Sequence, residues 1–139
     1  SNALLDYKYG RDFQYGEMVL TGPGEKGEAI AKGMAKTDAF GDNPPKPGEG
    51  PSKEERENGS YDVMFVAEAP DGERIIASVK GNKDPGYGST SKMIAESALT
   101  LVKDVKGAGG VFTTAPAMGQ ALTDRLQKHA GLTFAIEQG

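Results

Sequence analysis

The segment DPGYGSTSKM, residues 84–93, gathers side chains that could bind an anion. Its proline and two glycines allow the backbone to turn tightly and to approach a ligand closely. Ser89, Thr90 and Ser91 supply hydroxyl groups where a helix is predicted to begin, and Lys92 adds a positive charge. Because the N–H groups at a helix start attract negative charge, a phosphate or a carboxylate would suit this segment.

The candidate substrate-binding residues of this segment are Asp84, Tyr87, Ser89, Thr90 and Lys92. Asp84 and Lys92 could form an acid/base or orienting pair, which is work that usually requires a shifted pKa. The alternative is an ordinary turn, with an N-cap from Ser89 or Thr90. In that case Tyr87 packs nearby and Lys92 pairs with Glu96 one turn on.

A second candidate is the glycine pattern of Gly22, Gly24 and Gly27, which fits the G-x-G-x-x-G spacing of dinucleotide-binding loops. The context argues against a cofactor. The preceding apolar run contains a glycine and a glutamate, whereas the strand before such a loop is normally apolar throughout. Pro23 also removes one N–H from the loop. We therefore expect a glycine-rich turn and no cofactor-binding residues in this chain.

Metal, thiol and paired-carboxylate chemistry find little support. The chain has no cysteine and one histidine, His129, which is expected in the last turn of a helix, where a cation interacts well with exposed carbonyls. The acidic residues Glu54, Glu55 and Glu57 are expected on the solvated side of a short helix. Thr113 and Thr114 either line the cleft of the candidate site or are ordinary strand residues.

The strands that would position these residues are predicted from alternating apolar side chains. The clearest signal is a hairpin in which Pro70-Asp71-Gly72 joins two strands, with Val63, Phe65 and Ala67 on one face of the first and Ile75, Ala77 and Val79 on one face of the second. The expected strands are residues 12–21, 61–69, 74–81, 111–114 (strand or extended entry) and 132–137.

The expected helices are residues 25–37, 52–58, 89–105 and 116–130. Ser52 and Glu55 have the spacing of a capping box at the start of the second. The third has an apolar stripe of Ile94, Ala98, Leu101 and Val105, thickened by Met93 and Val102. Pro116 opens the fourth, whose buried stripe is Met118, Leu122 and Leu126 with Ala121 beside it.

Together these elements predict an α+β fold with a mixed, partly antiparallel sheet of about five strands and helices packed mainly on one face. Residues 1–3 are typical of a tag remnant. The rest, 4–139, is expected to form a single substrate- or dimerisation-type domain, with a proline- and glycine-rich loop at 41–51.

Composition excludes several classes of protein. The net charge is −4 without a basic stripe, which disfavours nucleic acid as a partner. No apolar run approaches the roughly 18 residues that a membrane helix needs, so no membrane span is expected. The absence of cysteine fits a cytoplasmic protein.

Three ordered blocks resemble a known family. GEGPSKEERENGSYDVMFVAEAPDGERIIASVKG, DPGYGSTSKMIAESAL and GGVFTTAPAMGQALTDRLQKHAGLTF are similar to the C-terminal part of saccharopine dehydrogenase-like oxidoreductases, in particular the bacterial branch that includes trans-acting enoyl reductases. The resemblance covers residues 48–136. The stretch 22–47 matches poorly.

The resemblance implies a division of labour. In this family an N-terminal Rossmann domain binds NAD(P), and the second domain covers the cofactor, shapes the substrate pocket and often supports a homodimer. This chain would be the second domain, with that Rossmann domain and a small-molecule substrate as its partners, and inactive by itself. A non-catalytic binding or dimerisation module that uses the sheet as its interface is the alternative. A lipid-handling role for helix 25–37 is disfavoured by its charges and small apolar face.

Overall fold

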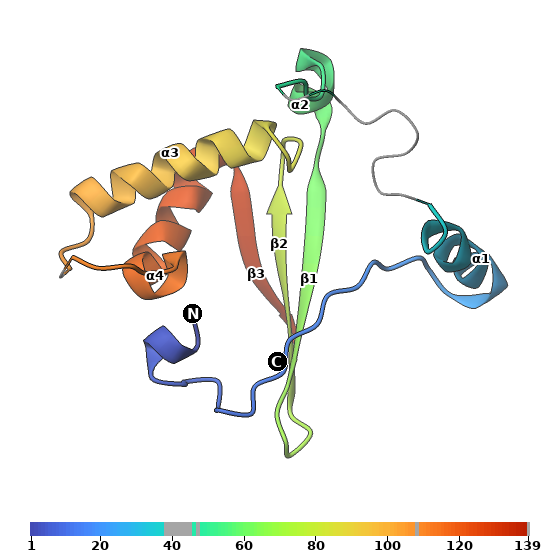
Figure 1. Ribbon diagram of the computed structural model, residues 1–139, viewed down its shortest axis with the longest axis horizontal. Helices are drawn as coiled ribbons and strands as arrows, with labels where there is room; N and C mark the ends of the chain where they lie inside the picture. Colours follow the sequence, from blue (N-terminus) through green and yellow to red (C-terminus); the bar gives the residue numbers. More distant parts are fainter. Residues whose placement is uncertain (38–45, 47, 108, 139) are drawn as a thin grey trace. The chain divides into compact units, whose positions relative to one another are not determined.

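The computed structural model describes residues 1–37, 46, 48–107 and 109–138. The chain divides into two compact units. Unit 1 comprises Ser1–Lys8 and Pro51–Gly139, and unit 2 comprises Tyr9–Gly50. The candidate site residues at 84–92 and the sheet belong to unit 1 (Figure 1).

The predicted hairpin is confirmed. Strands β1 (Tyr61–Glu68) and β2 (Arg74–Gly81) pair antiparallel, and Gly72 in the turn has a φ of 90°. The Ala69 N–H donates to the Glu73 carbonyl oxygen at 2.9 Å and closes the turn. Glycine takes this left-handed conformation without the steric cost that a Cβ would add.

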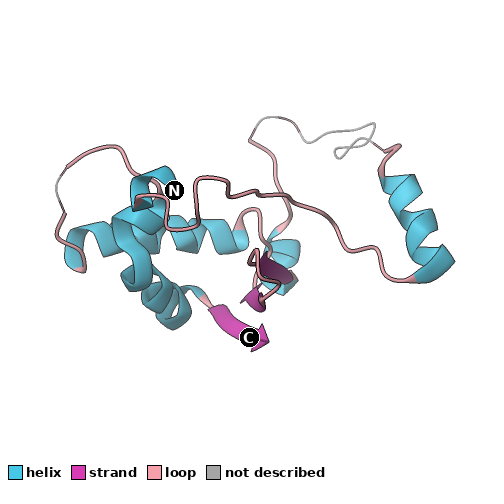
Figure 2. Ribbon diagram, turned by 90° about the horizontal axis from the view of Figure 1, so that it is seen from below, coloured by secondary structure: helices cyan, strands magenta, loops and turns pink. Residues whose placement is uncertain are grey.

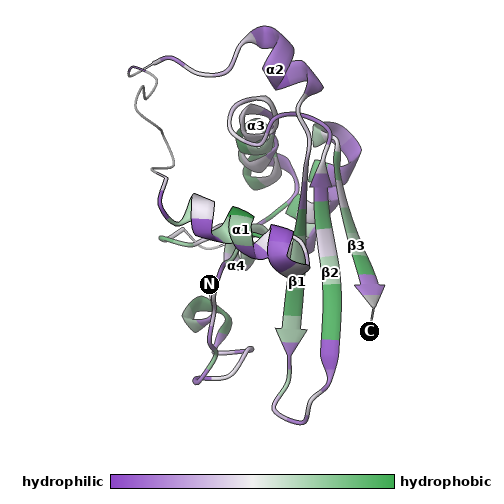
Figure 3. Cartoon of the chain, turned by 90° about the vertical axis from the view of Figure 1, so that its right-hand side faces the viewer, coloured by the Kyte–Doolittle hydropathy of each residue, from purple (hydrophilic) through white to green (hydrophobic). Residues whose placement is uncertain are grey.

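Strand β3 (Leu132–Gln138) pairs antiparallel with the other side of β2, so the strand order is β1-β2-β3. The register aligns Val63, Val79 and Phe134 on one face, which we call the apolar face. Figure 3 shows hydrophobic residues along the three strands. The faces predicted for β1 and β2 are therefore confirmed.

The core lies where helices pack on part of the apolar face. Helix α3 (Gly88–Lys103) contacts α4 (Thr114–Arg125) and the π-helical segment η2 (Leu126–Ala130), and η2 contacts β3. The core consists of Leu126, Ala130 and Leu132, surrounded by Val79, Met93, Leu122 and Phe134.

The predicted helix 116–130 has the expected buried face but not the expected regularity. Met118 and Leu126 are buried, as the stripe predicts. Gly119, however, has φ 49° and ψ −131°, which kinks α4, and the chain then continues as η2 up to Gly131. Only glycine takes such a backbone conformation readily, so the kink sits where the sequence allows it.

Two shorter elements agree with their local signals. Helix α2 (Lys53–Asn58) carries the predicted capping box: the Glu55 N–H donates to the Ser52 hydroxyl, and the Glu55 carboxylate accepts from the Ser52 N–H. In unit 2, α1 (Gly24–Met34) matches the predicted helix 25–37 but ends earlier.

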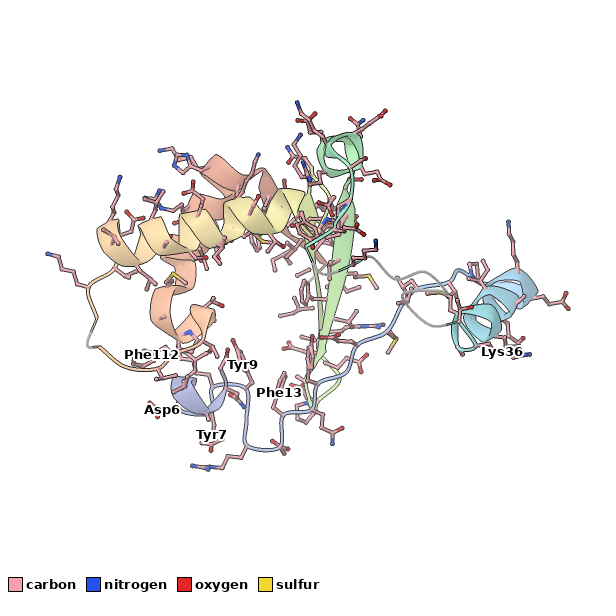
Figure 4. All side chains as sticks on the ribbon, turned by 45° about the horizontal axis from the view of Figure 1, so that its top comes forward. Asp6, Tyr7, Tyr9, Phe13, Lys36 and Phe112 are labelled. Atoms are coloured by element: carbon pink, nitrogen blue, oxygen red, sulfur yellow. The ribbon has the colours of Figure 1, made fainter. Side chains whose placement is uncertain are left out.

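Elsewhere, the rings of Tyr9 and Phe13 in unit 2 lie 5.4 Å apart (Figure 4), and a short 3₁₀ helix, η1, spans Ala3–Leu5 in unit 1. Of the predicted loop 41–51, residues 41–45 and 47 lie outside the described residues.

The mixed sheet of five strands is wrong. The described residues form four α-helices and one sheet of three strands, all antiparallel. The predicted α+β class is therefore confirmed, and Figure 2 distinguishes the helices (cyan) from the strands (magenta). The predicted strand 12–21 is absent, because Gly16 and Glu17 interrupt the alternation that a half-buried strand needs. Residues 111–113 form no strand, and Thr114 already belongs to α4, which leaves too short a segment for one.

The apolar stripe predicted for residues 89–105 is mostly exposed on α3, although Met93 packs against the core. Ile94, Leu101 and Val102 are 70%, 53% and 80% exposed. Ser89 and Thr100, on the other side of the helix, are 1% and 0% exposed. The buried side is polar because its hydroxyls and carboxylates find hydrogen-bond and ion-pair partners there, which offsets their burial.

Candidate functional site

The candidate site is a loop held between β2, α3 and the end of α2. The Asp84 N–H donates to the Arg56 carbonyl oxygen at 3.2 Å, and Lys83 Nζ donates to the Glu57 carbonyl at 3.1 Å. A Cβ on Gly88 would lie 2.6 Å from the Arg56 carbonyl oxygen. The loop therefore approaches α2 so closely that only glycine fits at position 88.

The Asp84 carboxylate organises the turn into α3. It accepts hydrogen bonds from the N–H groups of Gly86 at 2.9 Å, Tyr87 at 3.0 Å and Gly88. These bonds, the one from Gly88 first, lower the pKa of Asp84. The N–H groups that the sequence offered to a bound anion are thus engaged by the protein's own carboxylate, and a group held as an anion is a poor general acid.

The neighbouring hydroxyls also have internal partners. The Ser89 hydroxyl lies 2.8 Å from the Tyr61 hydroxyl of β1. Thr90 Oγ1 donates to the Pro85 carbonyl oxygen at 2.7 Å. The expectation that Ser89 or Thr90 caps α3 is wrong: the N-cap is Tyr87, which makes no side-chain capping bond, and Asp84 takes over the role.

Tyr87, Thr90 and Lys92 are the exposed members of the set. Tyr87 is 52% exposed and Lys92 is also exposed. The alternative expected Lys92 to pair with Glu96. Glu96 instead forms an ion pair with Arg125 at 3.1 Å. The structure therefore brings the five predicted residues together around the start of α3, where Asp84, Ser89 and Thr90 make contacts that shape it and Tyr87 and Lys92 are exposed beside them.

Arg125 forms an ion-pair cluster that the sequence reasoning missed. It binds Glu96 at 3.1 Å and Asp104 at 2.7 Å, and its side chain is only 16% exposed. The hydrogen bond to Asp104, followed by that to Glu96, raises the pKa of Arg125. The three residues are far apart in sequence, so no spacing signal could have joined them. The cluster fastens α3 to α4.

A second missed feature is an open cavity of about 520 Å³ at the end of the sheet away from the hairpin turn. Its lining comprises Ser60, Tyr61, Asp62, Lys80, Gly81, Asn82, Gly131 and Thr133. Lys80 Nζ lies 3.1 Å from Asp62 and 3.7 Å from Glu137, and the hydrogen bond to Asp62 is the main cause that raises the pKa of Lys80. The signal available in the sequence was the opposite charge of Asp62 and Lys80. Recognising it requires the strand register, which places the two residues opposite each other.

A larger cavity of about 780 Å³ lies between the end of α3 and the start of α4. Leu101, Val105, Phe112 and Pro116 contribute its apolar walls. Thr113 is the N-cap of α4, and its hydroxyl lies 2.7 Å from that of Ser1.

The glycine turn at 22–27 uses its glycines for its own backbone geometry. Gly22 and Gly24 have φ values of 89° and 69°, and a Cβ on Gly27 would collide with the Gly22 carbonyl oxygen. The third glycine thus makes room for the loop's own backbone, and Pro23 offers no N–H. The turn's own geometry accounts for its glycines.

Neither a metal site nor a membrane-spanning helix is found in the part of the chain that the structure describes. His129 lies on the exposed side of η2, near its end, as predicted. No group of three or more histidine, cysteine, aspartate or glutamate side chains among the described residues could hold a metal ion. No helix of the described residues is long and apolar enough to cross a bilayer.

Comparison with known proteins gives one consistent similarity. The chain is 34% identical over 146 residues to the trans-acting enoyl reductases of Mycobacterium ulcerans and Mycobacterium tuberculosis. It is 35% identical over 151 residues to a second M. tuberculosis protein, whose name assigns it this activity provisionally. Each alignment covers 91% of this chain and 35% of the relative. No protein-family model matches the chain, and no solved structure matches it. The chain thus spans about a third of the length of curated relatives that are named as enoyl reductases.

Proposed function

We propose that this chain is the substrate-side, C-terminal domain of a saccharopine dehydrogenase-like oxidoreductase that reduces enoyl groups. The observation that carries the proposal is the similarity of 91% of the chain to proteins named trans-acting enoyl reductase. An enoyl reductase adds a hydride and a proton across a carbon–carbon double bond, and a bound nicotinamide would supply the hydride. That cofactor would bind to a Rossmann domain outside this chain, since Pro23 offers no N–H and the segment before the glycine turn contains Gly16 and Glu17, which disfavours a nucleotide there.

The sheet supports a role as one wall of a substrate pocket. Along β1 and β2 the apolar face is only partly covered: Val63 and Phe65 are 44% and 47% exposed, and Ile75, paired with Ala67, is 50% exposed. These side chains carry no charge, as a wall against an acyl chain requires. The open surface begins two residues from Tyr61, whose hydroxyl meets Ser89 in the first turn of α3.

The turn at 84–92 would provide the polar end of that pocket. Asp84, Ser89 and Thr90 act as positioning residues, because their polar groups hold the turn and the start of α3 in place. Tyr87 and Lys92 are exposed and would contact the substrate. The Lys92 ammonium group suits a carbonyl oxygen or an anionic group near the reacting bond.

The test uses the full-length protein, with NADPH and an α,β-unsaturated acyl thioester as substrates. Lys92→Ala is expected to raise the KM for the thioester about tenfold, as loss of a charged hydrogen bond does, without changing NADPH binding. Lys103→Ala, an exposed lysine in the last turn of α3, is the matched control and should behave as wild type. Unchanged kinetics in Lys92→Ala would remove Lys92 from the site, and absence of any reduction across a panel of enoyl substrates would remove the function itself.

A non-catalytic binding or dimerisation module is the second candidate. The exposed apolar side chains of the sheet favour it, because a binding surface needs such a patch as much as a substrate wall does. The sequence upstream of this chain in its gene separates the two. A strand, a glycine loop and a helix of the Rossmann type would favour the enzyme, and their absence would favour the module.

A further inference from the structure

Strand β1 lies at one edge of the sheet but has the sequence of an interior strand. The order of the described strands is β1-β2-β3, so β1 pairs on one side only (Figure 1). Its central residues, 63–67, read V-M-F-V-A and contain no charged side chain. Continuous apolar runs are typical of strands that are covered on both faces, whereas edge strands usually carry charges, proline or a bulge.

Both faces of β1 are exposed. Val63 and Phe65 on the apolar face are 44% and 47% exposed, and Met64 and Val66 on the opposite face are 49% and 40% exposed. The proposed substrate wall accounts for the apolar face alone. A neighbouring strand would reduce the exposure of both faces at once, because its side chains would lie beside those of β1 on each face.

The backbone of β1 offers donors along the side that faces away from β2, which we call the free edge. At the hairpin turn the Ala69 N–H donates to the Glu73 carbonyl oxygen, toward β2. Because N–H groups alternate in direction along an antiparallel strand, and β1 pairs with β2 without a register shift, the even-numbered N–H groups face the free edge. This outward set belongs to Asp62, Met64, Val66 and Glu68.

The other edge strand, β3, has protections that β1 lacks. Its pairing with β2 has a register shift between Ile76 and Ala77, and Glu137 lies at that shift and forms an ion pair with Lys80. Bulges and charges of this kind prevent a further strand from pairing with an edge. In β1 the register is regular from end to end and residues 63–67 are uncharged, so this edge is open to another strand.

We propose that a β-strand of the full-length protein, from outside this chain, pairs with β1 along the free edge and makes β1 an interior strand. The occupant is an extended, uncharged segment of about five residues, which matches the apolar run of β1. The inference rests on the proposed function only in taking this chain as part of a longer protein. Each alignment covers 35% of the relative, so a protein of that length has ample further chain to supply the strand.

Charge disfavours a second copy of this chain as the occupant. Antiparallel pairing of two β1 strands about Phe65, the middle of the apolar run, would set Asp62 of each copy opposite Glu68 of the other. Like charges directly opposite each other destabilise a strand pair. A strand of the same polypeptide has no such constraint, and it pairs at the high effective concentration of a tethered segment.

The first test measures hydrogen exchange by mass spectrometry in the isolated chain and in the full-length protein. Peptides covering residues 62–68 should exchange at least about tenfold more slowly in the full-length protein, because the outward N–H groups gain acceptors there. Strand β2 is already paired on both sides, so it is the internal control. The ratio of the β1 rate to the β2 rate removes any general difference in stability.

An equal ratio in the two proteins would overturn the proposal. So would a β1 that is protected in the isolated chain to a degree that rises with protein concentration, since that result assigns the free edge to a second copy.

The second test distinguishes a paired strand from any other cover. Val66→Pro removes one outward N–H, and Val66→Ala is the matched control for the lost valine side chain. Proline is tolerated where the N–H of an edge strand faces solvent but not inside a sheet. The two variants should therefore have similar unfolding midpoints in the isolated chain, whereas in the full-length protein Val66→Pro should unfold at least about 4 °C below Val66→Ala. Equal midpoints in the full-length protein would overturn the strand pairing.

Neither test depends on catalysis. A full-length protein that protects β1 but reduces no enoyl substrate would remove the proposed function and keep the added strand. An active enzyme with an unprotected β1 would do the reverse.

Discussion

At the scale of single residues, the turn before α3 is controlled by Asp84. Its carboxylate lies where the helix start would attract an external anion, and it accepts from three consecutive N–H groups. A substrate carboxylate or phosphate would have to compete with it. The exposed Lys92 ammonium group binds a substrate anion without this competition from Asp84, which makes Lys92 the strongest anchor of the five candidates.

Replacing Asp84 tests this role through pH. Because hydrogen bonds lower its pKa in the folded state, Asp84 stabilises the fold fully above its unfolded pKa of about 3.9 and loses this contribution as pH falls through the lower folded value. Asp84→Asn has no ionisable carboxylate and therefore lacks this contribution to stability. Urea unfolding should show the variant less stable at neutral pH, and its difference from wild type should shrink below about pH 4. A difference independent of pH would show that the carboxylate charge does not stabilise the turn.

The buried hydroxyl pair of Ser89 and Tyr61 offers a second test at this scale. Ser89→Ala and Tyr61→Phe should each cost about 1 kcal/mol in the free energy of unfolding, the usual net value of a buried hydrogen bond. The double variant should cost less than the sum, because both changes remove the same bond. Ser91→Ala, on the exposed side of the helix, is the control and should change stability by less than about 0.5 kcal/mol. Strict additivity would mean that the two hydroxyls do not interact.

At the scale of elements, the sequence predicted those parts whose cause is local. The capping box of Ser52 and Glu55 and the turn at Gly72 depend on residues within a few positions of each other, and both are present. The failures concern partners distant in sequence. Residues 12–21 have a strand-like pattern, but a strand exists only when another strand accepts its hydrogen bonds. The orientation of α3 depends on Arg125, which no periodicity within α3 can reveal.

The candidate site shows the same contrast between features with a local cause and features that depend on residues distant in sequence. Sequence placed Asp84, Tyr87 and Lys92 on one turn at a helix start, and the structure has them there. It could not show that Asp84 occupies the N–H groups, because that depends on how the loop closes over α2.

The joint between η2 and β3 also depends on one residue, Gly131. Its φ is 75°, and a Cβ there would collide with the side chain of Asn82. Gly131→Ala should therefore destabilise the chain by about 1–3 kcal/mol, the usual cost of such backbone strain. Gly107→Ala, where no atom lies within 4 Å of the added Cβ, is the control. Equal unfolding midpoints in denaturant for both variants would show that the joint tolerates a side chain.

At the scale of the whole molecule, two uncovered apolar surfaces set what the chain can do. One is the exposed, uncharged side of α3, which includes Ile94, Leu101 and Val102. The other is the open part of the sheet's apolar face, around Phe65 and Ile75, which suits a substrate or another domain. The two surfaces belong to different elements, so substitutions on one should leave the role of the other intact.

The division of the chain into two units leads to a prediction about folding. Residues 51–139 contain the whole sheet, α3, α4, η2 and the core around Leu126 and Leu132. Because the core residues and the ion pairs of Arg125 all lie in this range, we expect a fragment of residues 51–139 to fold without residues 1–50. It should retain helical circular dichroism and unfold cooperatively, with a Tm within about 5 °C of the whole chain. An unfolded fragment would instead support a single domain over residues 4–139, in which the N-terminal segment is part of the cooperative unit.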